Sequence, residues 1–237
     1  MKTLLKKVLP KRLIELLVGL RGEYLDGYAI RSYSQEGEDM ILRRVFERQS
    51  LGFYVDVGAH HPKRFSNTYF FYKTGWSGIN IDAMPGSMKI FEKLRPRDTN
   101  IERPISGKKQ ILTYYAFNEP ALNGFSRELS EARDGKNNYK IEFTRDLETA
   151  TLEEILDEYL PSNQVIDFLS IDVEGVDFEV LKSINLKRYR PRVVLIEILG
   201  SSLSDLRQEK ICKFLEDQNY LVFAKAVNTV IFKSNFF

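Results

Sequence analysis

The stretch that decides the fold reads GFYVDVGAHH and runs from Gly52 to His61. Its first half, Phe53 to Val57, is a continuous run rich in aromatic and β-branched residues, which is typical of a strand buried on both faces. Small residues follow, and Gly58 can adopt backbone angles that are closed to other residues. A helical pattern comes shortly afterwards. Strand, small-residue turn and helix together predict a ligand pocket at the carboxyl end of a parallel strand.

Similar apolar runs alternate with helical patterns along the rest of the chain. Further strands are expected at Gly78–Asp82, Ile101–Ile105, Ile111–Phe117, Ile166–Ile171, Val193–Ile198, Tyr220–Ala226 and Thr229–Lys233. The alternation predicts an α/β fold, Rossmann-like, with a mostly parallel sheet and helices on both faces. The short connection at Val227–Asn228 makes the last pair antiparallel. We therefore expect an antiparallel strand at the C-terminal end of the sheet.

Composition narrows the class of protein. A chain of 237 residues with 43% hydrophobic and 29% charged residues is expected to form one large globular domain. The net charge of +2 gives no argument for nucleic acid as a partner. The single cysteine, Cys212, excludes an intrachain disulfide and a cysteine-rich zinc site, and it favours the reducing cytoplasm. The only histidines, His60 and His61, are adjacent, which excludes a site built from several imidazoles.

The N-terminus is basic and amphipathic. Within residues 1–20, Glu15 is the only acid, and leucines recur at roughly helical spacing among lysines. The apolar runs are too short and interrupted to span a bilayer, and no cleavage site of a signal peptide follows them. We expect residues 1–30 to form an extension to a single domain at 31–237. This extension either packs on protein or lies on an anionic membrane, which would make the chain peripheral at the inner membrane surface.

Residues 118–146 form a long polar segment without a steady period. A connection of this length inside a compact domain is usually functional or mobile. We therefore interpret the segment as a substrate-facing insertion.

Three carboxylates, Asp56, Asp82 and Asp172, stand at the carboxyl ends of predicted strands. In an open α/β sheet, such side chains face one crevice. Asp82 follows Asp56 by 26 positions, close to the usual distance of an acid that binds a ribose. Carboxylates repel a pyrophosphate, and the turn lacks the three glycines of the dinucleotide fingerprint. A cationic cofactor that carries a ribose but no phosphate, such as S-adenosylmethionine, meets these constraints.

Five motifs stand in a specific order. They read YSQEGED at Tyr33–Asp39, YVDVGAHHP at Tyr54–Pro62, SNT at Ser66–Thr68, GWSGINIDAMP at Gly75–Pro85 and LSIDVEGVDFEVL at Leu169–Leu181. In these motifs the chain resembles the FkbM-type methyltransferases, a branch of the class I S-adenosylmethionine enzymes. The resemblance implies the class I methyltransferase fold and an O-methyltransferase acting on sugars, polyketides or related natural products.

The resemblance also implies a set of site residues. The cofactor-binding residues expected are Gln35, Asp56, Gly58, Ala59, Asn67, Asp82, Ala83 and Ser106. Gly58 and its neighbours are expected at the methionine part of the cofactor, Asp82 at the ribose hydroxyls and Ser106 near the adenine. A purely structural role of Asp56, fixing the turn, stays open.

Methyl transfer from a sulfonium is an in-line displacement, so that positioning supplies much of the rate. A sugar hydroxyl must lose its proton near the transition state, and a carboxylate or an imidazole can take it. The catalytic candidates are Asp172, which by the resemblance faces donor and acceptor, Glu174 and His60. His60 as a turn cap and Glu174 as a charge match for the next helix are the structural alternatives. A divalent cation could assist, but two carboxylates are too few to assign a metal site.

The sequence thus predicts an S-adenosylmethionine-dependent O-methyltransferase with a saccharide or similar small-molecule acceptor. Two alternatives stay open. One is a non-catalytic binding or scaffold protein that keeps the fold. The other is a nucleotide-dependent oxidoreductase, which the missing glycines disfavour.

Overall fold

The computed structural model describes residues 10–237. The chain divides into two compact units, Met1–Ser32 and Tyr33–Phe237, called here the N-terminal unit and the main unit. In the N-terminal unit, α2 (Lys11–Tyr24) follows Pro10, and none of its residues is buried. The part of the predicted extension before Pro10 lies outside the described residues. Within residues 10–237, no helix combines the length and the apolar character that a membrane crossing needs.

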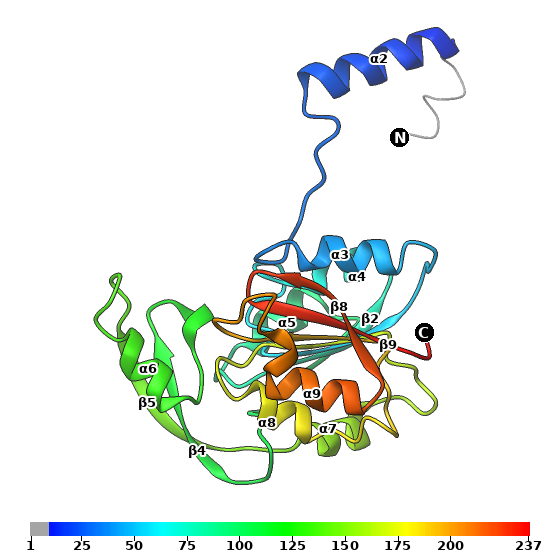
Figure 1. The fold of residues 1–237 in the computed structure, drawn as a ribbon. Helices are drawn as coiled ribbons and strands as arrows, with labels where there is room; N and C mark the ends of the chain where they lie inside the picture. Colours follow the sequence, from blue (N-terminus) through cyan, green and yellow to red (C-terminus); the bar gives the residue numbers. More distant parts are fainter. Residues whose placement is uncertain (1–9) are drawn as a thin grey trace. The chain divides into compact units, whose positions relative to one another are not determined.

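The main unit is built on a seven-stranded sheet with the order β3-β2-β1-β6-β7-β9-β8 (Figure 1). The strands are β1 (Phe53–Val57), β2 (Ser77–Asp82), β3 (Thr99–Glu102), β6 (Phe168–Ile171), β7 (Val193–Glu197), β8 (Tyr220–Ala226) and β9 (Thr229–Ser234). β1 pairs in parallel with both β2 and β6. β9 runs antiparallel to β7 and β8. The predicted α/β fold with its antiparallel C-terminal strand is therefore confirmed.

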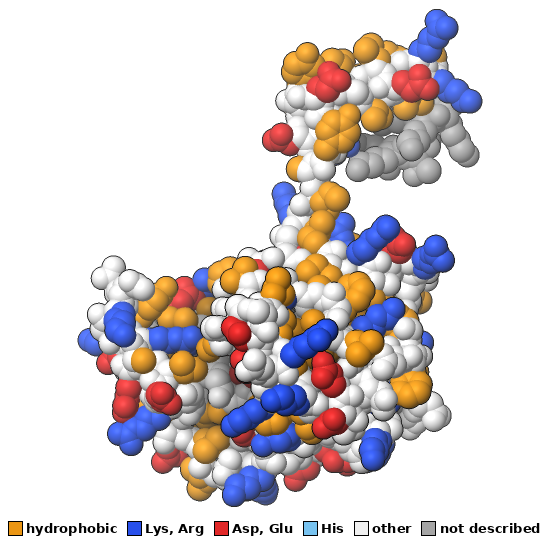
Figure 2. Space-filling view, in the orientation of Figure 1, with side chains coloured by type: hydrophobic (Ala, Val, Ile, Leu, Met, Phe, Trp, Pro, Cys, Tyr) orange, Lys and Arg blue, Asp and Glu red, His pale blue; other side chains and the backbone are white. Residues whose placement is uncertain are grey.

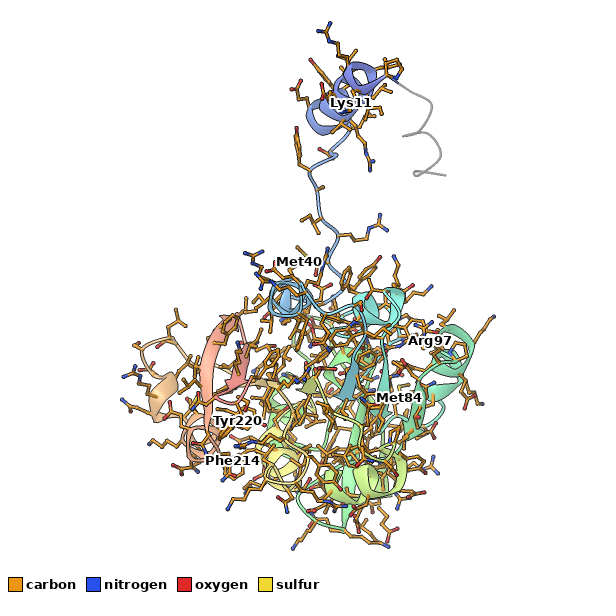
Figure 3. The ribbon with its side chains drawn as sticks, turned by 90° about the vertical axis from the view of Figure 1, so that its right-hand side faces the viewer. Lys11, Met40, Met84, Arg97, Phe214 and Tyr220 are labelled. Atoms are coloured by element: carbon orange, nitrogen blue, oxygen red, sulfur yellow. The ribbon has the colours of Figure 1, made fainter. Side chains whose placement is uncertain are left out.

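Helices cover both faces of this sheet. They are α3 (Glu38–Val45), α4 (Tyr69–Lys73), α5 (Met88–Leu94), α7 (Leu152–Tyr159), α8 (Asp177–Lys182) and α9 (Lys210–Asp217), with a short 3-10 turn, η2, at Leu206–Gln208. Val55 and Val57 of β1 belong to a core that includes residues of α7, α8 and α9. Tyr54, which points to the other face, packs in a second core with residues of α3 and α4. Phe214 and Tyr220, labelled in Figure 3, close the first core near the C-terminal strands.

A buried polar network supports the β1 strand from the Tyr54 face. Arg95 is fully buried and donates to Asp98 at 2.7 Å, to Tyr54 at 2.8 Å and to Thr68 at 2.9 Å. Thr68 in turn donates to Asp56 at 3.0 Å. A buried guanidinium requires such a set of acceptors, because an unpaired charge in the interior is strongly destabilising. The network ties the end of β1 to the segments that precede α4 and follow α5.

A second, two-stranded sheet forms beside the main one (Figure 1). β4 (Ile111–Phe117) pairs antiparallel with β5 (Ile141–Glu148). Between them lie η1 (Pro120–Leu122), a 3-10 turn, and α6 (Arg127–Arg133). The segment 118–146 thus contains a 3-10 turn, a helix and most of β5. Most β5 side chains are exposed, so the sequence has no apolar alternation from which this strand could be predicted.

Acidic and basic side chains intermingle over the face of the main unit that Figure 2 shows, without a large field of one sign. This distribution matches the small net charge of the chain.

Candidate active site

A cavity opens where β1, β2, β6 and β7 end. About 880 Å³ of empty space lies within it, a volume that includes the solvent at its open mouth. Seven of the predicted site residues line it, namely Gln35, Gly58, His60, Asp82, Ala83, Asp172 and Glu174. The strand order explains this convergence, because connections leave β1 and β6 in opposite directions and open a crevice between them.

Gly58 brings the ends of β1 and β6 together. Its φ is +83°, and a Cβ at this position would lie 1.7 Å from the carbonyl oxygen of Asp172. The N–H groups of Gly58 and Ala59 both donate to Ile81 O, at 2.9 and 3.0 Å. The close approach of two backbones, together with the positive φ, is why a glycine stands here.

Asp82 holds the turns on either side of the cavity. Its Oδ2 accepts from the backbone N–H of His60 and its Oδ1 from that of Met84, both at 2.8 Å. Met84, labelled in Figure 3, and Ala83 both line the cavity. Burial raises the pKa of Asp82, and the two N–H bonds oppose this rise. Each carboxylate oxygen keeps acceptor capacity, so Asp82 can still bind the hydroxyls of a ligand.

The two histidines have different environments. His60 has φ +51°, lines the cavity and stacks on Phe65, with ring centroids 6.2 Å apart. Burial and the neighbouring Arg64 lower the pKa of His60 to about 4. The imidazole is therefore neutral at pH 7 and can accept a hydrogen bond. His61 Nδ1 instead accepts the N–H groups of Lys63 and Arg64, so His61 is a turn cap.

Arg64 links this turn to the insertion. Its guanidinium donates to both carboxylate oxygens of Glu119, at 2.9 and 3.1 Å. Arg64 Nη1 also lies 3.4 Å from His60 Nε2. The pair is partly exposed and therefore adds little stability, but its two-point geometry fixes the residue that precedes η1 beside the cavity.

Asp172 is the first residue after β6, and its N–H donates to Val57 O at 3.0 Å. Its side chain is exposed to the cavity, and its carboxylate makes no hydrogen bond within the described structure. Water reaches the carboxylate through the mouth, but protein atoms surround it. Burial first and the nearby Glu197 second raise the pKa of Asp172 well above its ordinary value. Asp172 is thus the strand-end carboxylate best placed to receive a proton from a ligand.

Glu174 is already engaged by a cation. Its Oε2 accepts from Arg133 of α6 at 2.7 Å, and both side chains are mostly buried. A Cβ at Gly124 would lie 2.9 Å from Glu174 Cβ, so the insertion packs closely against this loop. This geometry favours a structural role, in which Glu174 holds α6 beside the cavity, over a role of Glu174 as the general base.

Four predicted cofactor residues, Asp56, Ala59, Asn67 and Ser106, do not line the cavity. Asp56 accepts from Thr68 inside the Arg95 network, which favours the structural alternative for this residue. Asn67 donates to Ser170 at 3.1 Å. Ala59 packs with Met88 and Phe91, and Ser106 is buried next to Ile105, which does line the cavity.

Other lining residues were not predicted. They include Met84, Arg103, Tyr114, Asn123, Phe125 and Glu197. Glu197 could have been predicted from the sequence, because an acid inside an apolar strand requires a partner. It also stands at the carboxyl end of its strand, where the ligand site of an α/β sheet forms. No sequence pattern marks Tyr114, Asn123 and Phe125 as site residues. They reach the cavity because the β4 segment folds back on itself, with Tyr115 and Gly124 exchanging N–H···O bonds of 2.9 and 3.2 Å.

The described residues contain no group of three or more side chains arranged to hold a metal ion. The cavity therefore has acids suited to hydrogen bonding and proton transfer but no built metal centre among residues 10–237.

The sheet order and the strand-end cavity define an α/β protein of the methyltransferase class. The methyltransferase FkbM domain matches residues 56–222, which span most of the main unit. The chain belongs to this family, and the resemblance seen in the motifs is confirmed. Among curated proteins, no relative matches the chain.

Proposed function

We propose that this chain is an S-adenosylmethionine-dependent O-methyltransferase that acts on a hydroxyl of a saccharide or a related natural product. One observation carries the proposal. Asp82 and Asp172, from the ends of β2 and β6, face a single cavity on either side of the Gly58 turn. This is the arrangement that an α/β sheet offers to a ribose-bearing ligand at its switch point.

The lining fits the cofactor by its chemistry. Carboxylates dominate the charged groups at the strand ends, which suits a ligand with a sulfonium and an ammonium group and disfavours a pyrophosphate. Asp82 has acceptor capacity for ribose hydroxyls. Ile81, Ile105 and Phe125 supply apolar surface for a flat base. The bound cofactor would supply an electrophilic methyl group.

Asp172 would receive the acceptor's proton, and His60 would orient the acceptor hydroxyl by a hydrogen bond. Both side chains line the cavity. The raised pKa of Asp172 makes its carboxylate the stronger base near neutral pH, whereas the lowered pKa of His60, about 4, makes its neutral imidazole a hydrogen-bond acceptor and only a weak base. Glu174, held by Arg133, would keep the insertion in place, so that the acceptor hydroxyl is positioned for in-line attack.

The acceptor would bind beside the insertion 118–146. Pro120, Ala121, Asn123 and Gly124 bring this segment into the cavity lining. Asn123 of this segment, together with His60 and Asp172 across the cavity, offers hydrogen-bonding groups that suit a hydroxylated acceptor.

Calorimetric titration with S-adenosylhomocysteine and with NAD tests the cofactor. Binding of the first and not of the second is the expected result, and the reverse would favour the oxidoreductase alternative. Transfer of a labelled methyl group to a panel of glycans then tests the reaction. Cofactor binding without transfer to any glycan would favour the scaffold alternative.

We also propose that the N-terminal unit contacts an anionic membrane from the cytoplasmic side. Leu13, Leu16, Leu17, Leu20 and Tyr24 are exposed and share one face of α2 at helical spacing. The sequence around them is basic, which complements anionic lipid headgroups. The free, buried Cys212 fits a reducing compartment.

A further inference from the structure

Asp172 and Glu197 are neighbours at the carboxyl ends of β6 and β7, where the site forms. β6 and β7 are parallel neighbours, and Ile171 is paired with Ile196. The next residue on each strand is Asp172 and Glu197 respectively, so their backbones lie about 5 Å apart, the spacing of paired strands. Both side chains line the same cavity. The register therefore places two carboxyl groups next to each other where a ligand would bind.

Glu197 has an unsatisfied acceptor. Its Oε2 is shielded from solvent and has no hydrogen-bond partner among residues 10–237. Arg133 lowers the pKa of Glu197 by its charge, but its guanidinium donates to Glu174 instead. A buried, ionised carboxylate oxygen without a donor is costly, so either a proton or a ligand must satisfy it.

The electrostatic surroundings favour a proton in the free protein. Burial raises the pKa of Glu197 to about 8, and Glu174, Asp177 and Glu36 add to the rise, while Arg133 opposes it. Burial also raises the pKa of Asp172, with Glu197, Asp177, Glu174 and Asp56 adding to it. Two carboxyl groups that enter one cavity from neighbouring strands do not both ionise readily, so the pair binds one proton between them.

We propose that Asp172 and Glu197 form a carboxyl–carboxylate pair that holds one shared proton in the free protein and releases it when the cationic group of a ligand binds beside it. The inference rests on the proposed function, because the sulfonium of S-adenosylmethionine is the cation expected there. The proton passes to solvent, and no other bond changes. The pair thereby makes Asp172 available as an ionised base once the methyl donor is present.

The test measures how many protons the protein releases when a ligand binds. The full chain is titrated calorimetrically at pH 7 with S-adenosylmethionine and with S-adenosylhomocysteine, each in buffers of different ionisation enthalpy. The two ligands share the amino acid and nucleoside parts, so the difference between their proton counts isolates the sulfonium. We expect the sulfonium ligand to release more protons, by up to about one for a single shared proton. Glu197→Gln and Asp172→Asn should each bring this difference close to zero.

Glu179→Gln is the matched control. Glu179 is an exposed acid of α8 that pairs with Lys182 and does not line the cavity. This variant should keep the wild-type difference, and all variants are checked for an unchanged melting temperature. Equal proton counts for the two ligands in the wild type, or an undiminished difference in Glu197→Gln, would overturn the inference.

The outcome is separable from that of the proposed function. If neither ligand binds, the cofactor assignment fails, and the pair is then examined in the free protein by ¹³C resonances of labelled Asp and Glu carboxyl groups. A carboxyl that titrates well above the ordinary range, and is lost in Glu197→Gln, supports the shared proton. Ordinary titration of all carboxyl groups refutes it.

Discussion

The backbone N–H of His60 donates to Asp82 Oδ2 at 2.8 Å, which joins the turn after β1 to the carboxylate at the end of β2. The same turn is fixed by two N–H bonds to Ile81 O. The acid proposed to bind the ribose therefore also shapes the turn against which the rest of the cofactor would lie. Loss of Asp82 should affect both functions together.

Asp82→Ala should weaken the affinity for S-adenosylhomocysteine by about tenfold to a hundredfold, because hydrogen bonds to a charged acceptor contribute about 1.5–3 kcal/mol. Calorimetric titration measures the change. Asp146→Asn, at an exposed acid of β5 that accepts from Thr113, should bind like the wild type. Wild-type affinity in Asp82→Ala would rule out the ribose role.

Gly58→Ala should destabilise the main unit severely, because its Cβ would meet the Asp172 carbonyl oxygen at 1.7 Å. Gly86→Ala is the matched control, since Gly86 also has φ +83° but open space around it. Gly86→Ala should cost only the strain of a left-handed residue, about 1–2 kcal/mol. Urea denaturation gives both free energies of unfolding, and equal losses would contradict the packing explanation.

Asp172→Asn should lower turnover by about a hundredfold or more while leaving cofactor affinity within a few fold, as expected for loss of a general base. The measurement is methyl transfer to an acceptor found in the glycan panel. Glu174→Gln should act differently. It weakens the contact with Arg133 and should raise the KM of the acceptor through the insertion. An unchanged rate in Asp172→Asn would remove this residue from the mechanism.

The pKa of His60 should be about 4, because burial and Arg64 disfavour its charged form. The chain has only two histidines, so a proton NMR titration with His60→Gln assigns both. A lowered pKa in the folded state means that the unfolded state binds a proton first as the pH falls. His60 therefore reduces stability between pH 6.5 and 4, and His60→Gln should flatten this loss. Titration of His60 near 6.5 would contradict the buried, neutral imidazole.

Flotation with vesicles tests the N-terminal unit. The full chain should float with anionic vesicles and not with neutral ones. Leu17→Glu, in the apolar face of α2, should reduce flotation more than Gly19→Glu, which adds the same charge on the polar face. Equal loss in the two variants would indicate that charge alone drives the contact, and removal of residues 1–20 without effect would dismiss it.

Local pattern determined most of the fold. The apolar runs located β1, β2 and β7 to within a residue. Thr151 and Glu154 stand at the spacing of a capping box, and both hydrogen bonds of this box form at the start of α7. β3 begins earlier than predicted, at Thr99, and it ends earlier because Pro104 has no N–H to continue the pairing. Such features need only neighbours in sequence, which is why they could be predicted.

The sequence by itself also determined that Asp82 and Asp172 stand at strand ends and that the chain carries the family's motifs. Only the tertiary structure decided that β6 and β7 are neighbours, which brings Glu197 beside Asp172. It also decided that Tyr114 and Phe125 reach the cavity. The physical reason is that residue patterns report which face of a segment is buried, whereas strand order and the docking of the β4 segment depend on contacts between residues far apart in the chain.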